Sequence, residues 1–326
     1  MYRLLPLPTD SVALDKTGAE FRSGCRFQVL WRERLFPEGS DDEFRAHGRP
    51  ILILRMKGTY SFGKKHRYLR FECIRVMKSV AVIPARMDSS RYPGKPLCDI
   101  QGMSMIEHVY RRTSRCEALD ETYVATPDVE IREEVVGFGG SVIMTGPHDR
   151  AIDRVAEAAE SVESDIVTVV QGDEPLVYPD MISAAIEPLR EEQNLNVTTM
   201  IKEIEDPDVF VDPNFPKVVI DAEDNILYFS REPIPNRHAK SFEEIRAFKH
   251  LAVIPFRREY LFTFSELSQT PLEKAESIDL LRALEHGHTV RAVEVDRNVY
   301  QVDTPEDHEA VNELISEDEL FDQYRQ

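Results

Sequence analysis

Three cationic side chains lie close together in one predicted loop of a chain whose net charge is −19. Arg86, Arg91 and Lys95 follow the apolar run 80–83, which ends at Pro84. Arginine offers a planar fork to phosphate oxygens, and lysine offers a point charge. A buried strand that continues into a cationic loop and then a helix commonly holds a phosphate chain. The alternative is a solvated basic loop, which the acidity of the rest of the chain makes the weaker interpretation.

Carboxylates follow a second predicted strand and precede the last predicted helix. The apolar run 165–170 leads into the sequence QGDEP, which contains Asp173. Beside a triphosphate, such a carboxylate would suit Mg²⁺, which binds carboxylates together with phosphate oxygens; Asp173 could also simply cap the next turn. In the sequence VDTPED, Asp303 or Thr304 is expected near the N-cap of a helix, with Pro305 at its first position.

Strands and helices alternate over the part of the chain that carries these loops. We expect strands at 80–83, 121–125, 141–144 and 165–170, and helices at 106–118, 129–138, 150–161 and 181–191. This order predicts an α/β fold with a doubly wound, mostly parallel sheet. Ligands of such sheets bind outside the carboxyl ends of the strands. The cationic loop and the QGDEP segment should therefore share one crevice.

The later part of the chain has a different pattern. Short strands are expected at 197–201, 217–221 and 227–230, followed by a helix at 278–286, a strand at 291–294 and a helix at 305–314. The three short strands indicate an antiparallel excursion from the main sheet, as in a lid or a dimerisation arm.

The first 76 residues differ from the rest in charge. They hold 15 basic and 9 acidic side chains, which leaves 25 basic and 50 acidic ones for 77–326. One strand is expected at 51–54, but the apolar residues of this segment keep no sustained period. Two interpretations of 1–76 remain: an accessory or disordered extension, or upstream sequence translated from a misassigned start. We favour the second.

Composition excludes several classes of protein. No apolar run approaches the ~20 residues that would cross a bilayer, and no secretory signal is apparent at the N-terminus. The four cysteines, at positions 25, 73, 98 and 116, form no C-x-x-C pair, which favours a reducing cytoplasm. The acidic excess after residue 77 would repel a phosphate backbone, so no nucleic-acid partner is expected. No membrane partner is expected either, because no apolar run is long enough to cross a bilayer.

The loop motif ARxxSxRxPGKPL resembles the nucleotide-binding signature of the 3-deoxy-manno-octulosonate (Kdo) cytidylyltransferases, also called CMP-Kdo synthetases. Further segments resemble the family in the same order, namely QGDEP, KVVIDAE with LYFSREPIP, the pair His250-Leu251, and VDTPED. The resemblance covers about 77–315, which would make 77–326 a cytidylyltransferase domain. It implies a nucleotidyltransferase-like fold and transfer of CMP from CTP to an acidic sugar.

The resemblance also implies roles for individual residues. Nucleotide binding is expected of Arg86, Ser89, Ser90, Arg91, Lys95 and Gln171. Acceptor binding is expected of Gln171, Arg231, His250 and Asp279. Asp173 and Asp303 are expected to hold Mg²⁺ and, with Arg86 and Lys95, to form the catalytic set. Arg231 as a carboxylate clamp and Arg231 as a surface ion pair remain equal alternatives.

The chain departs from the family's pattern where the family contacts its sugar. The SGTER segment is replaced by GPHDRAIDR, which leaves Arg154 as the counterpart of the arginine. Ile254 stands in place of a tyrosine, and Asp279-Leu280 in place of a Glu-Gln pair. Each hydrogen bond lost to a buried hydroxyl costs ~1–3 kcal/mol. We therefore expect a preference for a related 2-keto-3-deoxy acid over Kdo.

These observations predict a Mg²⁺-dependent cytoplasmic cytidylyltransferase that acts as a homodimer on CTP and an acidic sugar. Two alternatives remain open. One is a sugar-1-phosphate nucleotidyltransferase that uses another nucleotide, although the usual GxGTRL-type loop is missing. The other is a catalytically silent nucleotide-binding homologue, against which Lys95, Asp173 and Asp303 argue.

Overall fold

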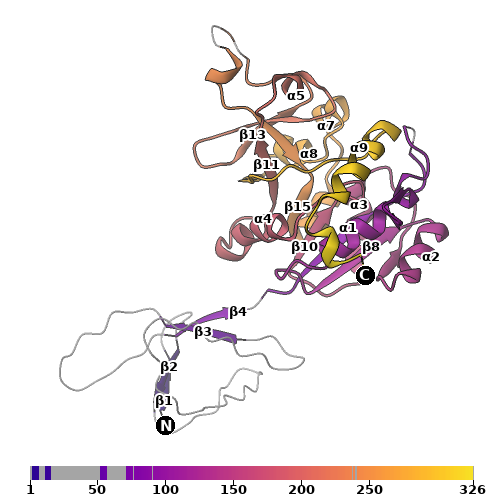
Figure 1. Cartoon of the computed structure of the whole chain (residues 1–326). Coiled ribbons are helices and arrows are strands. Elements are labelled where there is room, and N and C mark those ends of the chain that lie inside the picture. Colours follow the sequence, from indigo (N-terminus) through magenta and orange to yellow (C-terminus); the bar gives the residue numbers. More distant parts are fainter. Residues whose placement is uncertain are drawn as a thin grey trace. The chain divides into compact units, whose positions relative to one another are not determined.

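The computed structural model describes residues 2–6, 12–15, 52–56, 71–75, 77–89, 91–236, 238 and 241–325. The chain divides into two compact units, 1–76 and 77–326 (Figure 1). In the first unit, β1 (Tyr2–Pro6), β2 (Val12–Asp15), β4 (Phe71–Arg75) and β3 (Leu52–Met56) form an antiparallel sheet in that order. The strand expected at 51–54 corresponds to β3, and residue 51 lies outside the described residues.

The main sheet of the second unit is mostly parallel, as predicted. Its order is β15 (Val253–Arg257), β10 (Ile166–Val170), β5 (Ser79–Pro84), β8 (Glu121–Thr126) and β9 (Val142–Met144). Strands β10, β5, β8 and β9 are parallel, whereas β15 pairs with β10 in the antiparallel direction. The prediction had no strand at β15. Its sequence VIPFR contains a proline, which is tolerated at the edge of a sheet.

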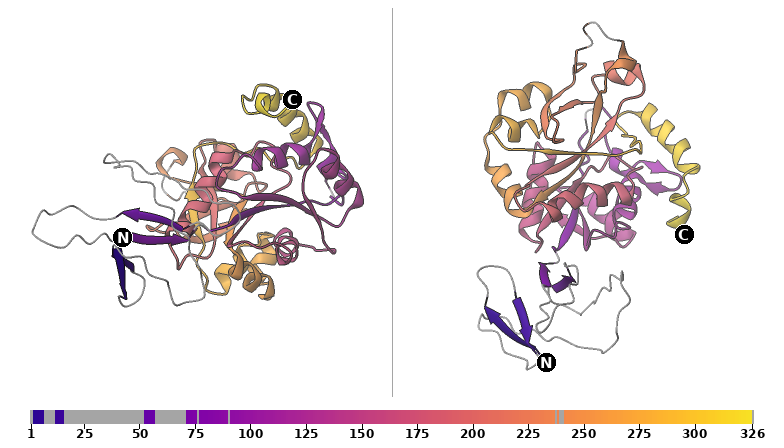
Figure 2. Two further views of the ribbon diagram at one scale, coloured as in Figure 1. Left: turned by 90° about the horizontal axis from the view of Figure 1, so that it is seen from below. Right: turned by 90° about the vertical axis from the view of Figure 1, so that its left-hand side faces the viewer.

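Helices cover both faces of this sheet (Figure 2). The alternation of side chains along β5 explains why. Val80 and Val82 belong to one apolar cluster, and Ala81 and Ile83 to the other. The first cluster is filled by α3 (Ala151–Glu160) and α6 (Arg258–Glu266). The second is filled by α1 (Met105–Thr113), α2 (Val129–Gly137) and α4 (Pro179–Glu191). The fold is therefore doubly wound.

The direction of winding reverses between β5 and β10. From β5 the chain goes to β8 and β9 on one side, and then to β10 on the other side of β5. The loops that follow β5 and β10 thus lie at a topological switch point, where open α/β sheets bind ligands. Gly172 brings them together closely, since a Cβ there would lie 2.7 Å from the carbonyl oxygen of Pro84.

A second sheet takes the place of the predicted antiparallel excursion. Its order is β13 (Ile226–Ser230), β12 (Lys217–Ile220), β14 (Phe248–Leu251), β11 (Thr198–Glu203) and β16 (Arg291–Glu294). The pairing of β11 with β16 is parallel, and the other pairings are antiparallel. The excursion is thus a mixed five-stranded sheet rather than an extension of the main one.

The remaining elements connect the sheets and close the chain. They are the strands β6 (Asp99–Ile100) and β7 (Met103–Ser104), and the helices α5 (Pro207–Val211), α7 (Pro271–Glu276), α8 (Leu281–Glu285) and α9 (Pro305–Ser316). The helix expected at 106–118 corresponds to α1, which ends at Thr113. Turns follow, and in one of them Cys116 N donates to Thr113 O instead of continuing the helical hydrogen bonds. None of the helices among the described residues is long and apolar enough to cross a membrane.

Candidate active site

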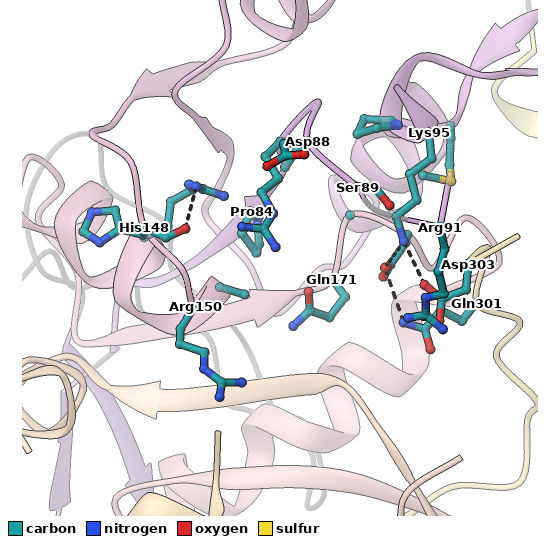
Figure 3. Close-up of a pocket in the computed structure, with 18 of the residues that line it drawn as sticks. Pro84, Asp88, Ser89, Arg91, Lys95, His148, Arg150, Gln171, Gln301 and Asp303 are labelled. Atoms are coloured by element: carbon teal, nitrogen blue, oxygen red, sulfur yellow. Dashed lines mark hydrogen bonds and ion pairs between the residues drawn. The ribbon is translucent and has the colours of Figure 1, made fainter. Parts of the chain in front are cut away.

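A cavity of about 290 Å³ lies at the carboxyl ends of β5 and β10, where the sequence predicted a crevice (Figure 3). Its wall is formed by the loop after β5, the start of α3, the residues after β10 and the segment before α9. Of the residues predicted for the site, it brings together Arg86, Ser89, Arg91, Lys95, Gln171, Asp173 and Asp303. Ser90 lies outside the described residues.

Lys95 links the two carboxylates that the sequence assigned to a metal. Its Nζ donates to Asp173 Oδ2 at 2.7 Å and to Asp303 Oδ1 at 3.0 Å. Burial alone would lower the pKa of Lys95, but the two carboxylates outweigh it and raise the pKa above the ordinary lysine value. Lys95 is therefore a fixed cation at this end of the cavity.

The capping of α9 explains why the Asp303 carboxylate can face the cavity and contact Lys95. Thr304 is the N-cap of α9, and its side chain accepts from Asp307 N in a capping box. The helix therefore does not need Asp303 as its cap. Val302 N donates to Asp173 O at 2.9 Å, which holds this segment beside the loop after β10.

Each of the two carboxylates has a further contact. Arg91 Nη2 lies 3.0 Å from Asp303 Oδ2, and Gln301 Nε2 donates to Asp173 Oδ2 at 3.3 Å. Asp173 Oδ1 is buried and has no hydrogen-bond partner among the described residues. A buried carboxylate oxygen without a donor is a suitable ligand for a cation.

The other end of the cavity contains residues that the sequence analysis did not assign to the site. Arg150 lines the cavity together with His148, which contacts Glu157. Arg154, named from the sequence only as the counterpart of a family arginine, also lines it and is 4% exposed. Its Nη2 donates to His148 O at 3.2 Å, and its Nε is buried without a partner in the described part of the chain.

Three described residues predicted for acceptor binding do not line this cavity: Arg231, His250 and Asp279. Arg231 donates from Nε to Glu276 O at 2.7 Å and from Nη1 to Pro213 O at 2.8 Å. No ion pair of the Arg231 side chain is found among the described residues, and its role as a clamp for the acceptor stays a prediction. Asp279 reaches the cavity through Arg150 Nη1, which lies 3.1 Å from Asp279 Oδ1.

His250 and Ile254 lie in packed surroundings. His250 Nε2 is 2.8 Å from Thr199 Oγ1, and its ring meets the Phe229 ring edge to face. Burial lowers the pKa of His250 to about 4, so its imidazole is neutral near pH 7. Ile254 is 4% exposed and belongs to the apolar cluster that contains Val80 and Val82. Its side chain fills the core rather than the wall of the cavity.

Comparison with known proteins agrees with this geometry. The family model described as "Cytidylyltransferase" matches residues 80–293. The chain belongs to the cytidylyltransferase family. It is 41% identical over 250 residues to a protein of Geobacter metallireducens named 3-deoxy-manno-octulosonate cytidylyltransferase, covering 74% of this chain and 98% of the relative. A protein of Geotalea daltonii with the same name is 43% identical over 251 residues, covering 74% and 99%.

Solved structures show the same relationship. A structure of CMP:2-keto-3-deoxy-manno-octonic acid synthetase complexed with CTP has 39% sequence identity and a TM-score of 0.69. The match covers 73% of this chain and 98% of that one. A 4-diphosphocytidyl-2C-methyl-D-erythritol synthase from Anaerococcus prevotii, at 14% identity and a TM-score of 0.52, shares the fold alone. The nucleotidyltransferase-like fold expected from the sequence is confirmed.

Proposed function

We propose that this protein transfers CMP from CTP to Kdo or a related 2-keto-3-deoxy sugar acid and releases pyrophosphate. The relatives that carry this name support the reaction, and the chain spans nearly their whole length. The observation that carries the proposal is the contact of Lys95 with both Asp173 and Asp303 inside a cavity at the switch point of the sheet.

Nucleotidyl transfer, like phosphoryl transfer in general, depends on positioning and on neutralising charge rather than on a covalent nucleophile of the enzyme. We assign Arg86, Arg91 and Lys95 to the triphosphate, where they would stabilise the departing pyrophosphate. Ser89, Ser90 and Gln171 would complete the nucleotide site. The anomeric hydroxyl of the acceptor attacks the α-phosphorus of CTP, the bond to pyrophosphate breaks, and the hydroxyl proton is lost to water.

A divalent metal ion, which we propose to be Mg²⁺, fits the carboxylate pair. Asp173 and Asp303 supply two oxygen ligands, and Asp173 Oδ1 is buried without a donor in the described part of the chain. When bound, the ion would neutralise charge on the phosphate oxygens. Lys95 and Arg91 hold the two carboxylates in place on the protein side.

Three residues predicted to bind the acceptor, Arg231, His250 and Asp279, lie outside the lining of the cavity. Asp279 touches the cavity wall through Arg150, whereas Arg231 and His250 as acceptor ligands stay predictions because neither lines the cavity. A homodimer, a lid or dimerisation role for the second sheet, and a cytoplasmic location also stay predictions. The role of the second sheet is inferred from the pattern of short strands, and the location from the cysteine pattern.

Pyrophosphate release tests the proposal directly. With CTP, Mg²⁺ and Kdo we expect continuous release, and none when any of the three is omitted. A parallel assay with other 2-keto-3-deoxy acids shows which acceptor has the highest kcat/KM. Thermal stabilisation by UTP but not CTP, with turnover of a sugar 1-phosphate, would favour the first rival function. CTP binding without turnover of any acceptor would favour a silent homologue.

A further inference from the structure

Arg150 connects the cavity with the segment between α7 and α8. It is the N-cap residue of α3 and lines the cavity, and its side chain is 20% exposed. Its Nη1 donates to Asp279 Oδ1 at 3.1 Å and to Ser277 Oγ at 3.2 Å. Figure 3 shows Gln171 between Arg150 and the group formed by Lys95 and Asp303.

Only one nitrogen of the Arg150 guanidinium is used by these contacts. Nε and Nη2 have no hydrogen-bond or ion-pair partner among the described residues, although the side chain lies in the cavity wall. Asp279 is itself largely enclosed, with 17% of its side chain exposed, and together with Ser277 it holds Nη1 in place. An arginine held at one nitrogen presents two parallel N–H groups, which match the two oxygens of a carboxylate.

The positions of the other cations favour the acceptor as the ligand of Arg150. Arg91 and Lys95 are gathered around Asp173 and Asp303, where the phosphates are placed by the proposed function. Arg231, the cation predicted to clamp the acceptor, already donates from Nε and Nη1 to two backbone carbonyls. Arg150, by contrast, lines the cavity and has both Nε and Nη2 free of partners among the described residues.

We propose that Arg150 binds the carboxylate of the acidic-sugar acceptor, and that Asp279 and Ser277 are positioning residues that orient its guanidinium. The inference rests on the proposed function and adds a specificity-determining residue to it. It also accounts for the replacement of the SGTER segment by GPHDRAIDR, because the departure places this arginine in the cavity wall.

The test compares full-length Arg150→Met and Arg150→Lys with the wild type in the pyrophosphate assay. A lost charged hydrogen-bond pair predicts a rise of about 10- to 100-fold in KM for Kdo in Arg150→Met. KM for CTP and the calorimetric Kd for CTP should stay within about threefold. Arg150→Lys keeps the charge but not the fork, so an intermediate rise is expected. The matched control is Arg297→Met, since Arg297 Nε pairs with Asp180 Oδ2 at 3.1 Å outside this cavity.

A second probe tests the carboxylate itself. In the wild type, kcat/KM should be higher for Kdo than for its carboxamide, because only Kdo carries the carboxylate. In Arg150→Met, most of this difference in kcat/KM should be lost. An unchanged discrimination in a folded Arg150→Met, or a rise confined to KM for CTP, would overturn the inference. If Arg150→Met does not fold, the same comparison is made with Arg150→Lys. A wild type that releases no pyrophosphate with Kdo or with any related 2-keto-3-deoxy acid would instead overturn the proposed function, before any variant is compared. If a related acid is the better acceptor, the variants are compared with that acid.

Discussion

Lys95 Nζ lies 2.7 Å from Asp173 Oδ2, although the two residues are 78 positions apart in the chain. The same ammonium group lies 3.0 Å from Asp303 Oδ1, at a separation of 208 positions. Two carboxylates that face one site repel each other unless a cation lies between them. Lys95 therefore serves as the counter-ion of the pair and is placed to meet the phosphates of a nucleotide.

Replacement of Lys95 by methionine should lower kcat by about 10²- to 10³-fold, as is typical when one charge-stabilising donor is removed. Pyrophosphate release under saturating CTP and Kdo measures the effect. Lys78→Met is the matched control, because Lys78 Nζ forms a partly exposed ion pair with Glu121 at 2.6 Å, away from the cavity. A Lys95→Met protein with near wild-type kcat would contradict the assignment.

The carboxylate pair predicts a dependence on divalent metal. Chelation of the metal should abolish turnover, and added Mg²⁺ should restore it. Asp173→Asn and Asp303→Asn should each lower kcat by on the order of 10²-fold or more, because an amide is a weaker ligand for a hard cation. Asp180→Asn, at an exposed ion pair with Arg297, should behave like the wild type. Full activity of both site variants at low Mg²⁺ would contradict the assignment of Asp173 and Asp303 as metal ligands.

The burial of His108 predicts that this residue makes the folded protein less stable in acid. Its side chain is fully buried, with Nδ1 2.8 Å from Tyr324 Oη and Nε2 2.8 Å from Ile100 O. Burial lowers the pKa of His108 from 6.5 to about 4. Between these values the unfolded chain binds a proton at this residue that the folded protein does not, so the contribution of His108 to the free energy of unfolding falls as pH drops from 6.5 toward 4.

The measurement for His108 is urea unfolding at several pH values. His108→Gln is expected to lower stability near pH 7 and to flatten the decrease between pH 6.5 and 4. A residual slope should remain, because burial also lowers the pKa of His250 to about 4. His286→Gln, at an exposed position, should keep the wild-type slope. An identical slope in His108→Gln and wild type would contradict the prediction.

The unit formed by 77–326 contains every residue that lines the cavity. A protein that begins at Met77 is therefore expected to fold and to release pyrophosphate with wild-type kcat and KM. Its thermal midpoint and steady-state constants are compared with those of the full chain. Insoluble or inactive protein would show that 1–76 takes part in folding or catalysis, against the interpretation of this segment as an extension.

Local sequence was sufficient for most of the elements that carry the site. The apolar run 80–83 lies within β5, and the proline of the sequence DTPED starts α9 at Pro305. These features depend on near neighbours, through side-chain period, capping and the missing N–H of proline. The order of strands and helices likewise predicted a crevice shared by the loops after β5 and β10. Strand β14 was missed because its sequence FKHL is short and half polar.

Tertiary structure decided which of the predicted side chains meet. The capping of α9 by Thr304 releases Asp303 to Lys95, a choice that the sequence left open. Arg150 could not be found from its neighbours, because its partner Asp279 lies 129 positions away. Arg231 was predicted as a clamp or a surface ion pair; the fold adds contacts of its Nε and Nη1 with two backbone carbonyls, and the clamp role stays a prediction. Contacts of this kind arise only when distant segments pack, so no local pattern of residues encodes them.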